Sequence, residues 1–152
     1  MKDINELKDQ VNTKTINFIL LTLATAGIYF IIWLNENHKK IDRITNSKTA
    51  DHNYIVWLAV CSGLGGSLSS TGEEITTTIG VILSIAYLVL CVIWAFRAKV
   101  ALQEYCLNNF KIDLRMNSFY VFIFTAYYIN YCINDLPEAH RKQQILNSHQ
   151  NN

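Results

Sequence analysis

Residues 75–96 read ITTTIGVILSIAYLVLCVIWAF, and this stretch decides the class of fold. It contains no Lys, Arg, Asp or Glu. A helix needs about 20 mainly apolar residues to cross the hydrocarbon core of a bilayer, with about 17 as the lower limit. A charge at mid-membrane costs roughly 2.5–3.5 kcal/mol. The stretch therefore predicts a transmembrane helix.

Three further stretches are apolar, uncharged and long enough to cross a bilayer. They are Ile16–Leu34, Tyr54–Ser70 and Met116–Ile133. None alternates with a period of two, so strands are disfavoured. We expect an all-α integral membrane protein with about four transmembrane helices, in which residues 1–152 form a single polytopic domain. Residues 148–152 are expected to be a disordered tail.

Composition agrees with one membrane domain rather than a soluble one. The chain has 152 residues, of which 51% are hydrophobic and 16% are charged, against about 25% charged in an average soluble domain. The 13 Lys and Arg nearly balance the 12 Asp and Glu, so the charge indicates no polyanionic partner such as nucleic acid.

The loops predict an orientation for the central pair of helices. Residues 35–53 and 97–115 are rich in Lys and Arg, whereas the short turn at 69–74 carries only Glu73 and Glu74. By the positive-inside bias the two basic loops are cytoplasmic and the acidic turn lies outside. Trp33, Trp57 and Trp94 would then all lie at the cytoplasmic interface, where we expect them to act as anchors.

The first and fourth stretches leave two arrangements open. Their length favours four full spans, which puts both termini outside together with five basic residues on the disfavoured side. Alternatively both stretches are re-entrant or interfacial, with every charge cluster cytoplasmic. Gly27 lies inside the first stretch and would permit a break in the helix.

Small residues predict how the central helices pack. Ala59, Gly63 and Ser67 follow one another at four-residue intervals, and so do Thr76, Gly80 and Ser84. This spacing places each trio on one helix face, where small side chains let two backbones approach closely in lipid. A tight antiparallel hairpin is expected, disrupted by Gly63→Leu or by Gly80→Leu.

Polar features around these helices have structural interpretations. Ala98, Ala101, Leu102 and Tyr105 predict a short cytoplasmic amphipathic extension along the membrane surface. Asn130 and Asn134 are expected to form interhelical hydrogen bonds.

No arrangement of residues points to enzyme chemistry, a cofactor or a metal. The four cysteines show no metal-ligand spacing, and a thiol in an apolar segment behaves as a small hydrophobe. His38, His52, His140 and His149 are scattered, which favours surface positions over a zinc site. No nucleophile has a base within reach, so we expect no catalytic residues and no enzyme activity.

The first apolar stretch contains a recognisable motif. Thr25, Gly27, Ile28, Tyr29 and Trp33 match a T-x-G-I-Y pattern followed by Trp. This motif resembles the signature of a bacterial membrane family known as domain of unknown function 4234. The resemblance implies a helical integral membrane fold and brings no known activity or catalytic residue.

The sequence leaves three functional hypotheses. The first is a non-enzymatic, multi-pass protein of the bacterial inner membrane that acts through helix–helix or lipid contacts. The second is a membrane-embedded immunity or superinfection-exclusion protein against a toxin or phage. The third is a small channel or transporter subunit. The expected partners are the lipid bilayer and other membrane proteins or further copies of the chain.

Overall fold

The computed structural model describes residues 3–150, which fold into six α-helices without a strand. The helices are α1 (Glu6–Val11), α2 (Thr15–Ala24), α3 (Ile28–Thr45), α4 (His52–Ser69), α5 (Glu74–Phe110) and α6 (Ser118–Gln150). The predicted all-α class is therefore confirmed.

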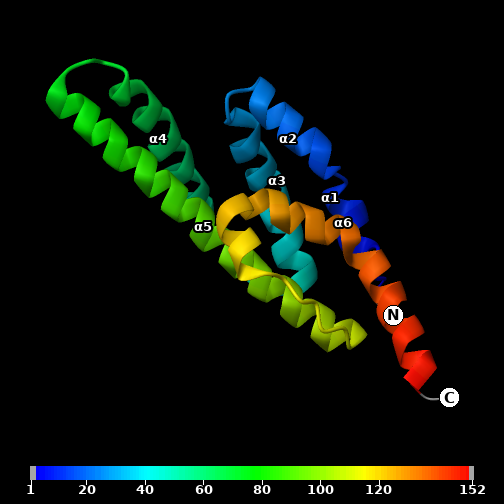
Figure 1. Ribbon diagram of the computed structural model, residues 1–152. Helices are drawn as coiled ribbons and strands as arrows, with labels where there is room; N and C mark the ends of the chain where they lie inside the picture. Colours follow the sequence, from blue (N-terminus) through cyan, green and yellow to red (C-terminus); the bar gives the residue numbers. More distant parts are fainter. Residues whose placement is uncertain (1–2, 151–152) are drawn as a thin grey trace.

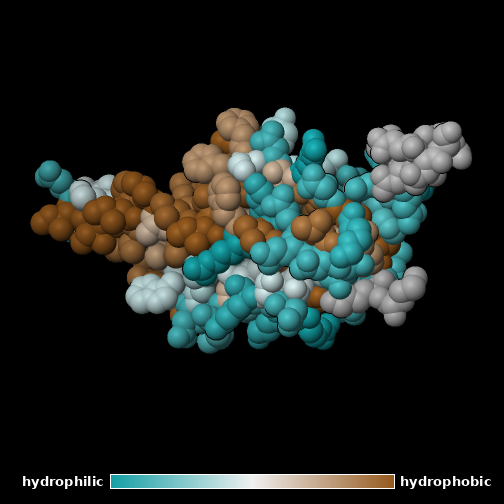
Figure 2. Space-filling model, turned by 90° about the horizontal axis from the view of Figure 1, so that it is seen from below, coloured by the Kyte–Doolittle hydropathy of each residue, from teal (hydrophilic) through white to brown (hydrophobic). Residues whose placement is uncertain are grey.

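Helices α4 and α5 form a long hairpin that projects from the rest of the molecule (Figure 1). Figure 2 shows that this projection is almost entirely apolar, whereas the remainder of that face is largely polar. We call residues 55–93 the apolar hairpin. We call the remainder, apart from α2 and the first turns of α3 and α6, the polar body.

Small residues bring α4 and α5 together, but not all of the predicted ones take part. Gly80 is buried, and a Cβ there would lie 2.8 Å from the backbone carbon of Leu68. A Cβ on Gly65 would lie 2.7 Å from Ser84 Oγ. The α5 trio of Thr76, Gly80 and Ser84 therefore faces α4, since its other two members are half-buried.

The predicted packing face of α4 is wrong. Ala59, Gly63 and Ser67 are exposed, and a Cβ on Gly63 would meet nothing within 4 Å. The contact is made two residues further along, by Gly65 and Ser69. The glycine run at 63–66 supports either register, so residue spacing alone did not distinguish the two faces.

The first apolar stretch is not one helix, and a single span over Ile16–Leu34 is wrong. Helix α2 ends at Ala24 and α3 begins at Ile28, and the two form a short hairpin (Figure 1). Ala26 and Gly27 have φ values of 48° and 92°, in the left-handed region that reverses the chain. The 10 residues of α2 extend about 15 Å, half the thickness of the hydrocarbon core.

The fourth stretch is also interrupted. Thr125 in α6 has φ 42° and ψ −119°, so the helix bends between residues 118–124 and the longer part that follows. One continuous helix over Met116–Ile133, as the sequence predicts, is therefore wrong as well. Helix α6 continues to Gln150, into the stretch predicted as a disordered tail, while residues 151 and 152 lie outside the described residues.

The polar body gathers elements from both ends of the chain. Helix α1 buries Leu7 and Val11 and contacts α3 and α6. The Arg43 guanidinium of α3 donates a hydrogen bond to Gln10 Oε1, at 3.2 Å. Both ends of the described chain therefore lie beside the basic loops, away from the tip of the apolar hairpin (Figure 1).

Helix α5 continues past the apolar hairpin into the polar body. Ala98, Ala101, Leu102 and Tyr105 are all buried. The predicted amphipathic face thus exists, but it packs inside the protein instead of lying along a membrane surface.

Replacing Gly80 by Leu is expected to destabilise the α4–α5 pair, whereas Gly63→Leu is not. The added side chain at Gly80 overlaps the α4 backbone, and such overpacking costs about 1–3 kcal/mol. Thermal unfolding of both variants in detergent measures the difference. Equal loss of stability in the two variants would contradict the observed register.

Candidate functional site

Four helices meet at a cluster of aromatic rings, which we call the aromatic junction. Phe18 of α2 stacks on Trp33 of α3, with ring centroids 4.4 Å apart, and lies 4.7 Å from Tyr127 of α6. Trp33 meets Trp94 of α5 edge to face at 6.2 Å. Buried aromatic pairs contribute about 0.5–1.5 kcal/mol beyond their area, so the junction fixes α2, α3, α5 and α6 to one another.

The three tryptophans predicted as interface anchors have different environments. Trp57 is 62% exposed, as an anchor requires, whereas Trp33 and Trp94 are 1% and 0% exposed. The anchor interpretation is wrong for these two residues. Their rings pack between helices. A position near the end of an apolar stretch does not distinguish an interface anchor from a tryptophan that packs between helices.

The motif around Thr25 forms the turn between α2 and α3. Thr25 Oγ1 donates a hydrogen bond to the carbonyl of Leu21 at 2.8 Å and accepts one from the N–H of Tyr29 at 2.9 Å. Gly27 supplies the left-handed backbone before Ile28, whose side chain is 63% exposed. The motif thus describes a self-capped helical turn.

Asparagines of α6 fasten this helix to the connection between α1 and α2. Asn130 is fully buried, and its Nδ2 donates to the carbonyl of Thr13 at 3.0 Å and to Thr15 Oγ1 at 3.2 Å. Asn134 Nδ2 also donates to the carbonyl of Thr13, at 2.9 Å. The predicted hydrogen bonds of both asparagines to another segment are confirmed.

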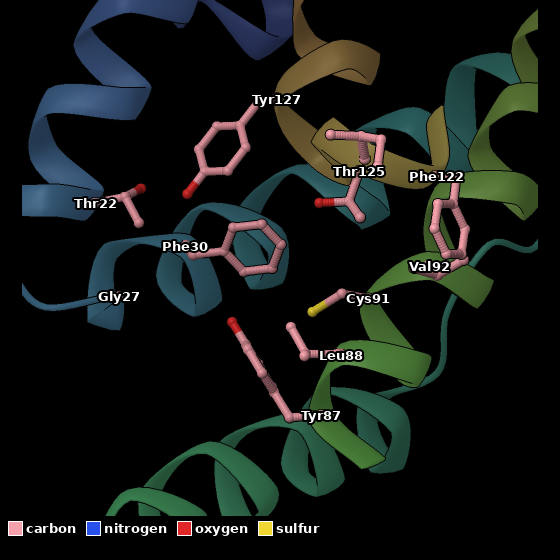
Figure 3. Close-up of a pocket in the computed structure, with 11 residues that line it drawn as sticks. Thr22, Gly27, Phe30, Tyr87, Leu88, Cys91, Val92, Phe122, Thr125 and Tyr127 are labelled. Atoms are coloured by element: carbon pink, nitrogen blue, oxygen red, sulfur yellow. The ribbon is translucent and has the colours of Figure 1, made fainter. Parts of the chain in front are cut away.

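A cavity of about 450 Å³ lies beside the aromatic junction. It is lined by the α2–α3 turn, the middle of α5 and the bend of α6 (Figure 3). Its lining is Thr22, Gly27, Phe30, Tyr87, Leu88, Cys91, Val92, Phe122, Ile123, Thr125 and Tyr127. Both interrupted backbones, at Gly27 and at Thr125, therefore border the same space.

The lining is mainly apolar with a few hydroxyl groups. In Figure 3 the hydroxyl ends of Tyr87 and Tyr127 and the sulfur of Cys91 point into the space. No lining residue is charged. Such a cavity suits an apolar molecule with one or two hydrogen-bonding groups.

Other titratable groups offer little reactivity in the polar body. Burial raises the pKa of the Cys106 thiol to about 12, so the thiol is protonated at neutral pH and is a weak nucleophile. Burial also raises the pKa of Tyr105 to about 12. Among the side chains described, those of residues 3–145, no three His, Cys, Asp or Glu lie close enough together to hold a metal ion.

His38 was predicted at the surface, and this is wrong. It is 2% exposed, with Nδ1 2.9 Å from the carbonyl oxygen of Leu34. His52 is exposed and His140 is half-buried against the ring of Phe110. The His149 side chain is outside the described part of the chain.

Among the described helices, one is long and apolar enough to cross a membrane: α5. One such helix, recognised by its length and composition alone, is weak evidence for membrane association. Only 22% of its most apolar 18-residue window is buried, however. A core helix of a soluble protein would be mostly buried.

Comparison with protein-family models matches residues 1–131 to Domain of unknown function (DUF389). The chain belongs to this family. The resemblance to domain of unknown function 4234 is therefore wrong. The motif behind it is a turn that caps itself, and a local hydrogen-bonding pattern of this kind does not define a family. Comparisons with curated proteins and with solved structures found no match.

We expect Asn130→Ala to loosen the attachment of α6 to the start of α2. The substitution removes the hydrogen bonds from Asn130 Nδ2 to the Thr13 carbonyl and to Thr15 Oγ1, each of which contributes about 0.5–1.5 kcal/mol. Asn108→Ala is the matched control because Asn108 is exposed on α5. Limited proteolysis and thermal unfolding in detergent measure the effect, and equal behaviour of the two variants would argue against the attachment.

Proposed function

We propose that this DUF389 chain is a multi-pass protein of the bacterial inner membrane that acts through lipid or helix–helix contacts and not through catalysis. The supporting observation is the exposed apolar surface of α5. Ile82, Leu88 and Val89 are 59%, 62% and 51% exposed. Soluble monomers rarely expose apolar patches larger than a few hundred Å², whereas lipid tails would cover such a surface.

The dimensions of the apolar hairpin fit a bilayer. Residues 75–96 of α5 extend about 33 Å and the 18 residues of α4 about 27 Å, against a hydrocarbon core of about 30 Å. Hydroxyls at the end of α4 bond back to its last carbonyls, as Ser70 Oγ does to Ser67 at 2.8 Å. We therefore assign α4 and α5 as full spans.

The α2–α3 hairpin and the start of α6 enter the membrane only partly in this arrangement. Exposed apolar side chains cover both, including Leu23 at 74% and Phe122 at 56%. Gly27 and Tyr87 line the same cavity, and Tyr87 lies about 14 Å along α5 from Phe96. The α2–α3 turn would thus reach the middle of the bilayer.

Charge distribution supports this re-entrant arrangement over four spans. Every Lys and Arg within residues 3–150 lies in the polar body or at the start of α2, and only Glu73 and Glu74 lie at the far tip. The positive-inside bias then has no exception, and the polar body with both termini is cytoplasmic.

Ile82→Arg should prevent stable membrane insertion. An arginine at mid-membrane costs roughly 2.5–3.5 kcal/mol, and Ile82 points outward from the apolar hairpin. Val100→Arg is the control, since Val100 is exposed on the polar-body part of the same helix. Resistance to alkaline carbonate extraction measures insertion. Wild-type protein that is extracted as a soluble monomer would refute the proposal.

At either terminus, fused green fluorescent protein should fluoresce and fused alkaline phosphatase should be inactive, because both termini are placed in the cytoplasm. At Gly72, in the α4–α5 connection, the phosphatase should be active and the fluorescent protein dark, because this connection is placed on the outer side. Paired alkaline phosphatase and green fluorescent protein fusions at the three positions make the measurement. Termini on the outer side would contradict the re-entrant arrangement.

A further inference from the structure

The cavity beside the aromatic junction opens at a depth where only lipid would surround the protein. Three of its lining residues, Leu88, Phe122 and Ile123, are 62%, 56% and 51% exposed. These exposed side chains mark the mouth of the cavity on the membrane-facing side. A ligand entering here would come from the bilayer and not from water, so this inference rests on the membrane placement proposed above.

Two interrupted helices border the cavity from opposite sides. Non-helical backbone at membrane depth is tolerated where it is buried in protein or lines a cavity, and ligand sites of membrane proteins often form at such breaks. Gly27 provides one break and Thr125 the other. A β-branched residue at φ 42° and ψ −119° is strained by about 1–3 kcal/mol. Strain of this kind clusters at ligand sites.

The chemistry of the lining restricts the ligand. No charged side chain borders the space, so a charged ligand would lie in it unpaired, at a large desolvation cost. The hydroxyl groups of Thr125 and the two tyrosines can donate or accept hydrogen bonds, whereas the Thr22 hydroxyl donates to the Phe18 carbonyl and can only accept. The volume of about 450 Å³ lies within the range for small-molecule sites, about 300–1,000 Å³.

We propose that the cavity between the α2–α3 turn, α5 and the bend of α6 binds an uncharged amphiphile dissolved in the bilayer. Its apolar chain lies against Phe30, Leu88 and Val92. Its hydroxyl or carbonyl head group bonds to the hydroxyls of Tyr87 and Tyr127, which Figure 3 shows directed into the space.

Photolabelling of the full-length protein in phosphatidylethanolamine–phosphatidylglycerol vesicles tests the proposal. The probe is dodecanol carrying a diazirine, and the comparison probe is dodecane carrying the same group. We expect the alcohol to label peptides that contain the lining residues. It should do so about three- to tenfold more than the alkane, from one or two hydrogen bonds to the head group.

Two kinds of variant locate the site. Cys91→Phe fills the space into which the thiol points and should reduce this labelling about tenfold, since a packed cavity does not accept further groups. Tyr87→Phe with Tyr127→Phe keeps both rings and should abolish only the preference for the alcohol. Val100→Phe, outside the lining, should change neither.

The outcomes separate this proposal from the membrane placement. Unchanged labelling in Cys91→Phe, or equal labelling by alcohol and alkane in the wild type, would overturn the ligand site while the protein remains carbonate-resistant. Extraction of the wild-type protein by carbonate would overturn the placement and, with it, the ligand site.

Discussion

A peptide group inside a bilayer has no water to bond, so a turn at that depth needs acceptors for its N–H groups within the protein. In the membrane placement proposed above, the turn between α2 and α3 meets this requirement. The N–H groups from Thr25 to Phe30 each have an acceptor, including the Thr25 hydroxyl for Tyr29. Because the turn is closed, α2 folds back along α3 and places Phe18 on Trp33. The aromatic junction then holds α5 and α6 in position.

The sequence predicts the apolar hairpin well because its two helices are continuous and uncharged. It predicts the outer segments poorly, since an apolar count measures affinity for lipid and not the continuity of a helix. Gly27 was the available signal for the first break. Thr125 gave none, because a β-branched residue is not expected at a positive φ. The charge pattern, by contrast, favoured the alternative with every charge cluster cytoplasmic, which is the arrangement proposed here.

The candidate site was likewise predicted from the sequence only in part. Asn130 and Asn134 were identified correctly, since a buried amide in an apolar helix must find a partner. The junction and the cavity were missed, because they depend on which ring faces which helix. Trp33 and Trp94 have the amphipathic side chains of interface residues, and only three-dimensional contact shows that both are interior. The predicted packing face of Ala59, Gly63 and Ser67 was wrong for a related reason. Small residues form two overlapping rows in α4, and the sequence does not show which row contacts α5.

The short connection at the tip of α4 and α5 has a consequence for biogenesis. In the proposed topology, Glu73 and Glu74 are the only ionised side chains within residues 3–150 that must be translocated. No folded region and no positive charge has to be exported. The two helices can therefore enter the bilayer together as one closed loop, while the rest of the chain assembles on the side where it was synthesised.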